Sequence, residues 1–368
     1  MFDNRLLRNL DFILIIAVVL LNVISIVMIT SATHVNSLSI GANEYVQKQA
    51  LFFLLNLVLA FFFLRFDYGQ REHLGAPLYI FNIFMLLAVM FAGHSALGAQ
   101  RWLQIGPLSV QPSEFAKIIT IIGLANILNR CKENLNGVWD AAPVLGYVFL
   151  PFLLVLKQPD LGTSLVFLFI TAVMLYIAGM PARFYGYLTG IMLALTPVFW
   201  HLLKDYQKQR ILVFLNPERD PYNSGYHVIQ SKIAIGSGML TGKGLFAGTQ
   251  SQLSFLPENH TDFIFAVIGE ELGFVGVMVV LILYGVIFYR GIKIAMEAKD
   301  DFGALLAIGI VSMLAFHIVV NIGMTVGIMP VTGIPLPFMS YGVSSLTANM
   351  LCVSILLNIN MRRKILFF

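Results

Sequence analysis

The chain has 368 residues, of which 58% are hydrophobic and only 11% are charged, and its formal net charge is +4. A soluble domain has about a quarter of its residues charged, so this composition excludes a soluble globular protein. The apolar runs are continuous and about twenty residues long, whereas the strands of a membrane barrel alternate over about ten residues. We therefore expect an all-α integral membrane protein.

Ten hydrophobic segments predict a polytopic bundle of about ten transmembrane helices within one membrane domain, residues 1–368. The first segment follows Arg5 and Arg8 and is too long for the apolar core of a cleavable signal peptide, so we expect it to remain as an anchor. The predicted segments are 11–31, 48–65, 74–92, 112–130, 141–157, 161–180, 183–203, 263–289, 303–328 and 341–361.

Lysine and arginine are distributed unevenly between the two sides of this bundle. With the N-terminus inside, thirteen lie on the cytoplasmic side and four on the outside, apart from one long loop, so both termini are predicted to be cytoplasmic. The positive charge thus concerns orientation, and we expect no nucleic acid partner. The inner set is Arg5, Arg8, Arg65, Arg71, Arg130, Lys132, Arg183, Arg290, Lys293, Lys299, Arg362, Arg363 and Lys364, and the outer set is Lys48, Arg101, Lys117 and Lys157.

Charged residues lie at the predicted outer start of segment 112–130. Glu114 and Lys117 are three residues apart and therefore share one helix face. Below the membrane surface they would either form an internal ion pair or meet a ligand. The preceding loop places Arg101 beside Trp102, a residue type that also serves as an interfacial anchor.

Two irregular segments follow. Asp160, in a short outer turn, is placed to cap the helix predicted over 161–180. Residues 329–342 contain three prolines and two glycines, so they cannot form a regular helix. They are nevertheless apolar, and we expect them to fold back into the bundle and line a cavity. Cys131 and Cys352 are interpreted as packing residues.

Residues 201–263 form the most unusual part of the sequence, a polar and glycine-rich stretch predicted to be a long extracytoplasmic loop. Loops of this length inside a compact bundle are uncommon and are usually functional. Its glycines would let the backbone approach a bulky polar ligand. They are Gly225, Gly236, Gly238, Gly242, Gly244 and Gly248.

Asp262 closes this loop directly before an apolar run. By residue type alone, Thr261 or Asp262 would be a helix cap. However, Glu258, Asn259 and His260 crowd the same turn. A partly desolvated carboxylate there would have a raised pKa and could act as a general base.

Glu270 and Glu271 lie eight and nine residues beyond Asp262, about 12 Å deeper along a helix. They point in different directions around that helix, so the three acids cannot form one carboxylate pair and should have different partners. Internal pairing or capping of a broken helix is the alternative to a functional role.

Several motifs together resemble the bacterial SEDS family (shape, elongation, division and sporulation) along the whole chain. Within this family the short N-terminus and the stretches 158–164, 229–238 and 331–337 resemble the RodA branch rather than the FtsW branch. The motifs are Phe214-Leu-Asn-Pro-Glu-Arg-Asp-Pro221, Gly225-Tyr-His-Val-Ile-Gln-Ser-Lys232, Gly248-Thr-Gln-Ser-Gln252, Phe255-Leu-Pro-Glu-Asn-His-Thr-Asp-Phe-Ile-Phe265, Gly269-Glu-Glu-Leu-Gly273 and Pro335-Leu-Pro-Phe-Met-Ser-Tyr-Gly342.

The resemblance implies a peptidoglycan glycosyltransferase that polymerises lipid II onto an undecaprenyl-pyrophosphate-linked glycan during cell elongation. It would act at the outer face of the bacterial inner membrane, with a class B penicillin-binding protein as its transpeptidase partner. The family's essential aspartate matches Asp262. One departure is Val343, which stands where the family commonly has glycine. The expected substrate contacts are Arg101, Trp102, Glu114, Lys117, Glu258 and His260.

In the implied reaction, Asp262 would take the proton of a sugar hydroxyl as that oxygen attacks the donor's anomeric carbon. Negative charge would then grow on the departing pyrophosphate. Arg101, Lys117 or a bound divalent cation, Mg²⁺ or Mn²⁺, would stabilise that charge.

Two other functions fit a bundle of this kind. A flippase would move lipid II between leaflets and would keep that activity when Asp262 is neutralised, although no inverted repeat is evident. A scaffold that recruits other wall enzymes would tolerate loss of all the polar motifs. Polymerisation of lipid II by the purified chain separates the enzyme from both.

Overall fold

The structure is a computed structural model that describes residues 9–34, 42–69, 75–96, 99–106, 108–131, 135, 137–220, 224–253 and 255–363. Each of the ten predicted segments contains a helix, with bounds that differ from the prediction by a few residues. The helices are α2 (Phe12–Ala32), α3 (Ala42–Phe63), α4 (Gly75–Ala92), α5 (Pro112–Cys131), α6 (Ala142–Lys157), α7 (Leu161–Ile177), α8 (Ala182–Leu202), α12 (Ile264–Met296), α13 (Asp301–Val326) and α14 (Val343–Met361).

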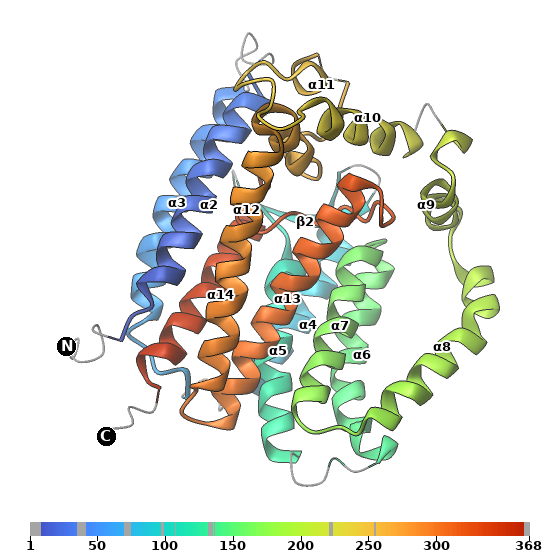
Figure 1. Cartoon of the computed structure of the whole chain (residues 1–368). Helices are drawn as coiled ribbons and strands as arrows, with labels where there is room; N and C mark the ends of the chain where they lie inside the picture. The colour runs from blue at the N-terminus through green and yellow to red at the C-terminus, as the bar shows by residue number, and fades with distance from the viewer. Residues whose placement is uncertain are drawn as a thin grey trace.

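The protein is a polytopic, all-helical membrane protein. Within the described part of the chain, seven helices are long and apolar enough to cross a membrane, and α7 is a shorter apolar helix. The exact number of crossings remains a prediction. Figure 1 shows α8 diverging from the other helices, and most of its side chains are exposed.

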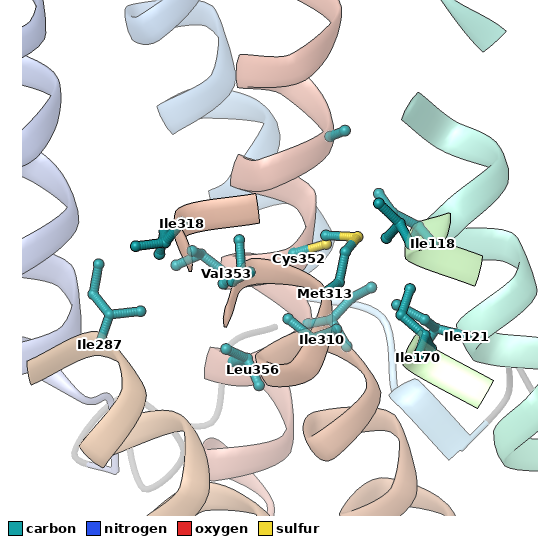
Figure 2. Close-up of a cluster of buried hydrophobic side chains, with 14 of the residues drawn as sticks. Ile118, Ile121, Ile170, Ile287, Ile310, Met313, Ile318, Cys352, Val353 and Leu356 are labelled. Carbon is teal, nitrogen blue, oxygen red and sulfur yellow. The ribbon is translucent and has the colours of Figure 1, made fainter. Parts of the chain in front are cut away.

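The core lies where α5, α7, α12, α13 and α14 meet, and α13 and α14 are buried along most of their length. Figure 2 shows this apolar cluster, in which Ile121 of α5 and Ile170 of α7 lie near Ile310 and Met313 of α13. Cys352 of α14 belongs to the same core and is a free thiol, which agrees with its interpretation as a packing residue.

The stretch 201–263 contains four short helical elements, whereas its composition predicts a loop. Figure 1 shows α10 and α11 over one end of the bundle, with α9 farther out. Proline and glycine lie mainly between these helices. The composition averaged over the whole stretch therefore does not reveal the helical segments. The elements are α9 (Asp205–Leu215), η5 (Pro217–Arg219), α10 (Ser224–Ser237) and α11 (Thr249–Gln252).

Helix α12 is interrupted at Gly273, which has a φ of 64° and so splits the helix into two parts. Residues 239–244 bridge this interruption. The N–H groups of Lys243 and Gly244 donate to the carbonyls of Glu270 and Glu271, both at 3.0 Å. In return, the N–H groups of Phe274 and Val275 donate to the carbonyls of Met239 and Leu240 at 2.9 and 3.1 Å. The loop thus satisfies the backbone groups freed by the helix break.

The close approach of glycine backbone in this region is to the protein's own chain. A Cβ on Gly242 would lie 2.0 Å from the Glu271 carbonyl oxygen, and one on Gly238 would lie 1.8 Å from that of Gly269. A Cβ on Gly248 would lie 2.8 Å from the Glu270 carboxylate. For these three glycines the expectation of a bulky ligand is therefore wrong, because the space beside them is filled by α12. For Gly236, which has no heavy atom within 4 Å of an added Cβ, it stays a prediction.

A small antiparallel sheet precedes α5, in the order β1-β2-β3. Its strands are β1 (His94–Ala96), β2 (Ala99–Ile105) and β3 (Leu108–Val110). His94 pairs with Trp102, and Leu103 pairs with Val110. This region was predicted to be a loop, because such short strands show no clear alternation in the sequence.

Candidate active site

A cavity of about 480 Å³ opens at the end of the bundle covered by the sheet and the turn before α12. Four parts of the chain form its walls: α3, the sheet and its exit, the turn 260–262, and the segment 333–345. The lining residues are Lys48, Trp102, Gln104, Leu108, Ser109, Gln111, His260, Thr261, Asp262, Gly333, Pro335, Tyr341, Gly342, Val343 and Ser345. The prediction that part of 329–342 lines a cavity is confirmed.

Asp262 is partly buried in the cavity wall, two residues before α12. Among the described residues, no hydrogen bond or ion pair reaches its carboxylate. The N-cap position of α12 is Phe263, and no side chain caps this end, so the capping interpretation is wrong. Gly333, with a φ of 75°, leaves room for the carboxylate, because a Cβ there would lie 3.4 Å from Oδ2.

The backbone around Asp262 is held firmly although its carboxylate is unpaired. Asn321 of α13 donates its side-chain N–H to the Asp262 carbonyl at 3.0 Å and to the Ile334 carbonyl at 2.7 Å. Ser340 donates its hydroxyl to the Thr261 carbonyl at 2.6 Å. The turn is therefore tied both to α13 and to the irregular segment that follows it.

Burial raises the pKa of Asp262 to about 6, and the nearby charge of Glu258 acts in the same direction. Arg210 and Arg101 oppose this rise in pKa. A carboxyl group with a pKa close to the working pH can both hold a proton and release it, which is the property of a general base.

Aromatic rings form one wall of the cavity near this carboxylate. The His260 ring lies 5.0 Å from that of Tyr45 and 5.9 Å from that of Tyr341, measured between ring centroids. Burial lowers the pKa of His260, so the imidazole is neutral at pH 7. Trp102, on β2, adds another ring to the lining. Because Trp102 lines the cavity, its role is not limited to that of an interfacial anchor.

Glu258 lies outside the set of cavity-lining residues and is exposed, with a φ of 51°. Its carboxylate accepts a hydrogen bond from the Thr261 hydroxyl at 3.0 Å. Glu258 therefore influences Asp262 through its charge and through the turn that both residues belong to.

Arg101 lies beside the junction between α6 and α7. Its guanidinium donates to the carbonyls of Gln158 and Pro159 and lies 3.7 Å from the Asp160 carboxylate. Asp160 also accepts the Thr163 N–H at 3.1 Å, so the predicted cap of α7 is confirmed. Arg101 is absent from the cavity lining.

Glu114 and Lys117 form an internal ion pair at 2.8 Å, and their side chains are only 2% and 1% exposed. Lys117 Nζ also lies 3.0 Å from His317 Nε2. Neither residue of the pair lines the cavity. The structure therefore favours the ion-pair interpretation, and direct substrate contact by either residue remains a prediction.

Several residues that were not predicted as site residues also shape the site, among them Lys48, Arg210 and Val343. Lys48 lines the cavity and pairs with the exposed Glu44 at 2.5 Å. Arg210 of α9 acts on Asp262 through its charge. Val343 is the first residue of α14 and forms part of the cavity wall. For Arg210, the available signal is its place between the polar run 204–209 and the apolar run 211–215.

Glu270 and Glu271 have different partners, as predicted. Glu270 accepts hydrogen bonds from Lys243, from the Thr249 hydroxyl and from two backbone N–H groups at the start of α11. Glu271 accepts from Ser31 of α2 at 2.7 Å and from Gln252 at 3.3 Å. These acids attach α11 to the bundle.

In the described part of the chain, no three metal-ligating side chains come together. A divalent cation at the site stays a prediction.

The fold and the site together define a class: a polytopic helical membrane protein with a polar and aromatic cavity and an unpaired aspartate at one end. The family model described as "Cell cycle protein", covering FtsW, RodA and SpoVE, matches residues 12–365. The chain belongs to this family, which is the SEDS family expected from its motifs, and it is similar to RodA.

Peptidoglycan glycosyltransferase MrdB of Escherichia coli is 47% identical over 292 residues, which are 78% of each chain. Stage V sporulation protein E of Bacillus subtilis is 38% identical over 95% of this chain and 96% of its own. RodA of Thermus thermophilus has a TM-score of 0.72 at 29% identity, covering 96% of this chain and 97% of that one. A structure described as a peptidoglycan synthase complex that coordinates polymerization and crosslinking has a TM-score of 0.80 at 32% identity, covering 95% and 97%.

Proposed function

We propose that this chain, a peptidoglycan glycosyltransferase by family, polymerises lipid II at the outer face of the bacterial inner membrane with Asp262 as general base. One observation carries the assignment of the base. The Asp262 carboxylate faces the cavity without a partner among the described residues, and its pKa is about 6. A carboxylate kept only as a structural group would be paired or hydrogen bonded.

The chemistry is the attack of a sugar hydroxyl on the anomeric carbon of the growing glycan. The new bond joins the hydroxyl oxygen to that carbon, while the bond from the carbon to the pyrophosphate oxygen breaks. The hydroxyl proton moves to Asp262, and the electron pair of the broken bond leaves with the pyrophosphate. Attack opposite the leaving group converts an α-linked donor into a β-linked product.

The cavity suits the acceptor, lipid II. Its rings, from Trp102, His260 and Tyr341, provide flat apolar surface for a sugar, while Gln104 and Gln111 provide hydrogen-bonding groups. Lys48 is the cation of the lining and would meet an acidic part of the acceptor. Both substrates are lipid-anchored, so the bilayer plane limits the orientations that they must search.

The orientation follows from charge. Cytoplasmic termini would place the cavity and residues 201–263 at the outer face, where lipid II is polymerised. Within a single membrane domain, α10 and α11 pack over the bundle, so the stretch 201–263 is an integral part of that domain. A class B penicillin-binding protein is the proposed partner. The similarity to a chain of a synthase complex that combines polymerization with crosslinking supports this assignment.

The decisive experiment incubates purified protein with fluorescent lipid II, alone and with its transpeptidase partner, and separates the glycan products on a gel. Asp262→Asn should lower the rate at least about 100-fold, since general base catalysis contributes that much. Glu218→Gln, which removes an exposed carboxylate of η5, serves as the matched control and should polymerise normally.

Polymerisation at the native rate by Asp262→Asn would overturn the assignment of the base. The same preparations in vesicles test the flippase alternative, because a flippase would move lipid II between leaflets without forming glycan. A scaffold would support wall synthesis only through other enzymes, so the purified chain would form no product.

A further inference from the structure

Two arginines from distant parts of the sequence lower the pKa of Asp262, namely Arg210 of α9 and Arg101, which lies beside the junction between α6 and α7. Arg210 Nη1 donates to the Thr332 carbonyl at 3.3 Å, and its guanidinium lies 5.9 Å from the centre of the Tyr206 ring. The Tyr206 hydroxyl donates at 3.4 Å to the Pro159 carbonyl, which is also an acceptor for Arg101. A continuous chain of contacts therefore joins the two guanidiniums.

The two guanidiniums are only partly neutralised. Most of their hydrogen-bond acceptors are backbone carbonyls, which carry no net charge, and Asp160 reaches Arg101 only at 3.7 Å while also capping α7. Within the described residues, no carboxylate forms an ion pair with Arg210. Burial lowers the pKa of Arg210, and the charge of Arg101 lowers it further. Like charges held together in a partly buried place are costly unless an anion joins them.

Apolar surface adjoins these cations. Arg210 borders a small recess of about 10 Å³ whose other walls are apolar. These walls come from α9, α10 and the segment 329–331, namely Val213, Phe214, Val228, Met329, Pro330 and Val331. A cation beside apolar side chains suits an anion that is attached to a hydrocarbon chain, in contrast to a free inorganic ion.

We propose that Arg210, together with Arg101, binds the pyrophosphate of the polyprenyl-linked donor, outside the acceptor cavity, whose lining contains neither arginine. The inference rests on the proposed function and assigns separate binding groups to the donor and the acceptor. Arginine suits this task because its planar donors bind two phosphate oxygens at once.

The charges balance during the reaction. Before it, the negative charge of Asp262 acts on both arginines, since both lower its pKa. As Asp262 takes the hydroxyl proton, that charge disappears, and the departing pyrophosphate gains one negative charge when the bond to the anomeric carbon breaks. One negative charge thus moves from Asp262 to the pyrophosphate that the arginines already bind, so the net charge of the site stays constant and water need not reorganise around it.

The test measures binding to the purified full-length protein in detergent, by calorimetry with farnesyl pyrophosphate as a short polyprenyl pyrophosphate. Arg210→Gln should weaken binding about 10- to 100-fold, the loss expected for one charged hydrogen-bonding group. Arg101→Gln should also weaken it. Arg210→Lys, which keeps the charge but loses the planar fork, should give an intermediate loss and shows that the effect is not misfolding.

Lys208→Gln is the matched control. Lys208 carries the same charge on the same helix. Because it lies two residues before Arg210, its side chain points about 200° away around the helix axis. Its substitution should leave farnesyl pyrophosphate binding unchanged. Asp262→Asn should bind the probe at least as tightly as the native protein, because a repelling negative charge is removed. The binding result is therefore independent of whether Asp262 is the base.

A second arm uses nanodiscs with phosphatidylglycerol, which offers a single phosphate on a lipid. Native affinity of Arg210→Gln for farnesyl pyrophosphate would overturn the proposal. An equal loss of phosphatidylglycerol binding would overturn the donor assignment and identify a general site for anionic lipid headgroups. Loss for the pyrophosphate alone is the supporting result.

Discussion

Two acids of the same region, Asp262 and Glu270, have opposite surroundings. Glu270 is fully buried, and its two oxygens accept from Lys243, Thr249 and the N–H groups of Gln250 and Ser251. Asp262 is partly exposed, faces a cavity and receives no hydrogen bond on its carboxylate from the described residues. An acid saturated with donors attaches one segment to another, whereas an acid left without partners is available for chemistry.

The ion pair of Glu114 and Lys117 resembles Glu270 in that its charged groups are buried and have partners within the protein. It is more deeply buried than Asp262, and it has a third member in His317. Sequence reasoning could not separate it from a ligand site, because both require charged residues near a membrane surface. The structural distinction is whether the charged atoms reach the cavity.

The largest expected effect breaks the attachment role of Glu270. Glu270→Ala should destabilise the protein by about 4 to 5 kcal/mol, because Lys243 and two backbone N–H groups lose their acceptor. Asp262→Ala should cause no comparable loss, since its carboxylate has no partner to lose. Thermal unfolding in detergent compares the two, and a similar loss for both variants would contradict the distinction.

The ion pair offers the next test. Lys117→Met should cost about 3 kcal/mol, because it leaves the Glu114 carboxylate buried without its cation. The double variant Glu114→Gln with Lys117→Met should recover part of this loss, since the uncompensated charge is gone. Lys293→Met, which breaks an exposed pair with Glu297, is the control and should cost less than about 1 kcal/mol. Additive effects in the double variant would argue against the buried pair.

The smallest expected effect is the pH dependence of the polymerisation rate, which tests Asp262 as the general base. Only the ionised base accepts a proton, so polymerisation should rise with pH through about 6 and fall about tenfold by pH 5. Glu258→Gln should move this midpoint to lower pH, because one of the charges that raise the Asp262 pKa is removed. A rate independent of pH between 5 and 7 would count against Asp262 as the base.

The same raised pKa has the opposite sign for stability. A carboxyl group whose pKa is higher in the folded state favours folding when it is protonated, so its contribution is present below about pH 4 and is lost as the pH rises through 6. Activity and this contribution to stability should therefore change in opposite directions over the same pH range.

Much of the fold could be predicted from the sequence, because long apolar segments are a strong and local signal. The ten segments, the cap at Asp160, the separate partners of Glu270 and Glu271 and the cavity-lining role of 329–342 all follow from hydropathy, residue type and helical geometry. The prediction that Asp262 and Trp102 both contact substrate rested on family motifs. The sequence alone gives no reason to bring together two residues that are 160 positions apart.

The parts that were missed depend on contacts between distant residues. The three-stranded sheet has strands as short as three residues, and its register is set by pairing rather than by pattern. The break at Gly273 requires the donors and acceptors of 239–244, which no local signal reveals. Arg210 could not be recognised from the sequence, because its relation to Arg101 and Thr332 depends on where α9 lies in the fold.

The bridge across the break in α12 has a consequence for local opening. The amides of Lys243 and Gly244 are bonded to helix carbonyls, and those of Phe274 and Val275 are bonded to the loop, so neither segment can open alone. Their protons should exchange with solvent together and slowly, as one cooperative unit, although residues 239–244 have the composition of a surface turn. The first half of α12, which begins two residues after Asp262, is part of that unit and gives the carboxylate a rigid support.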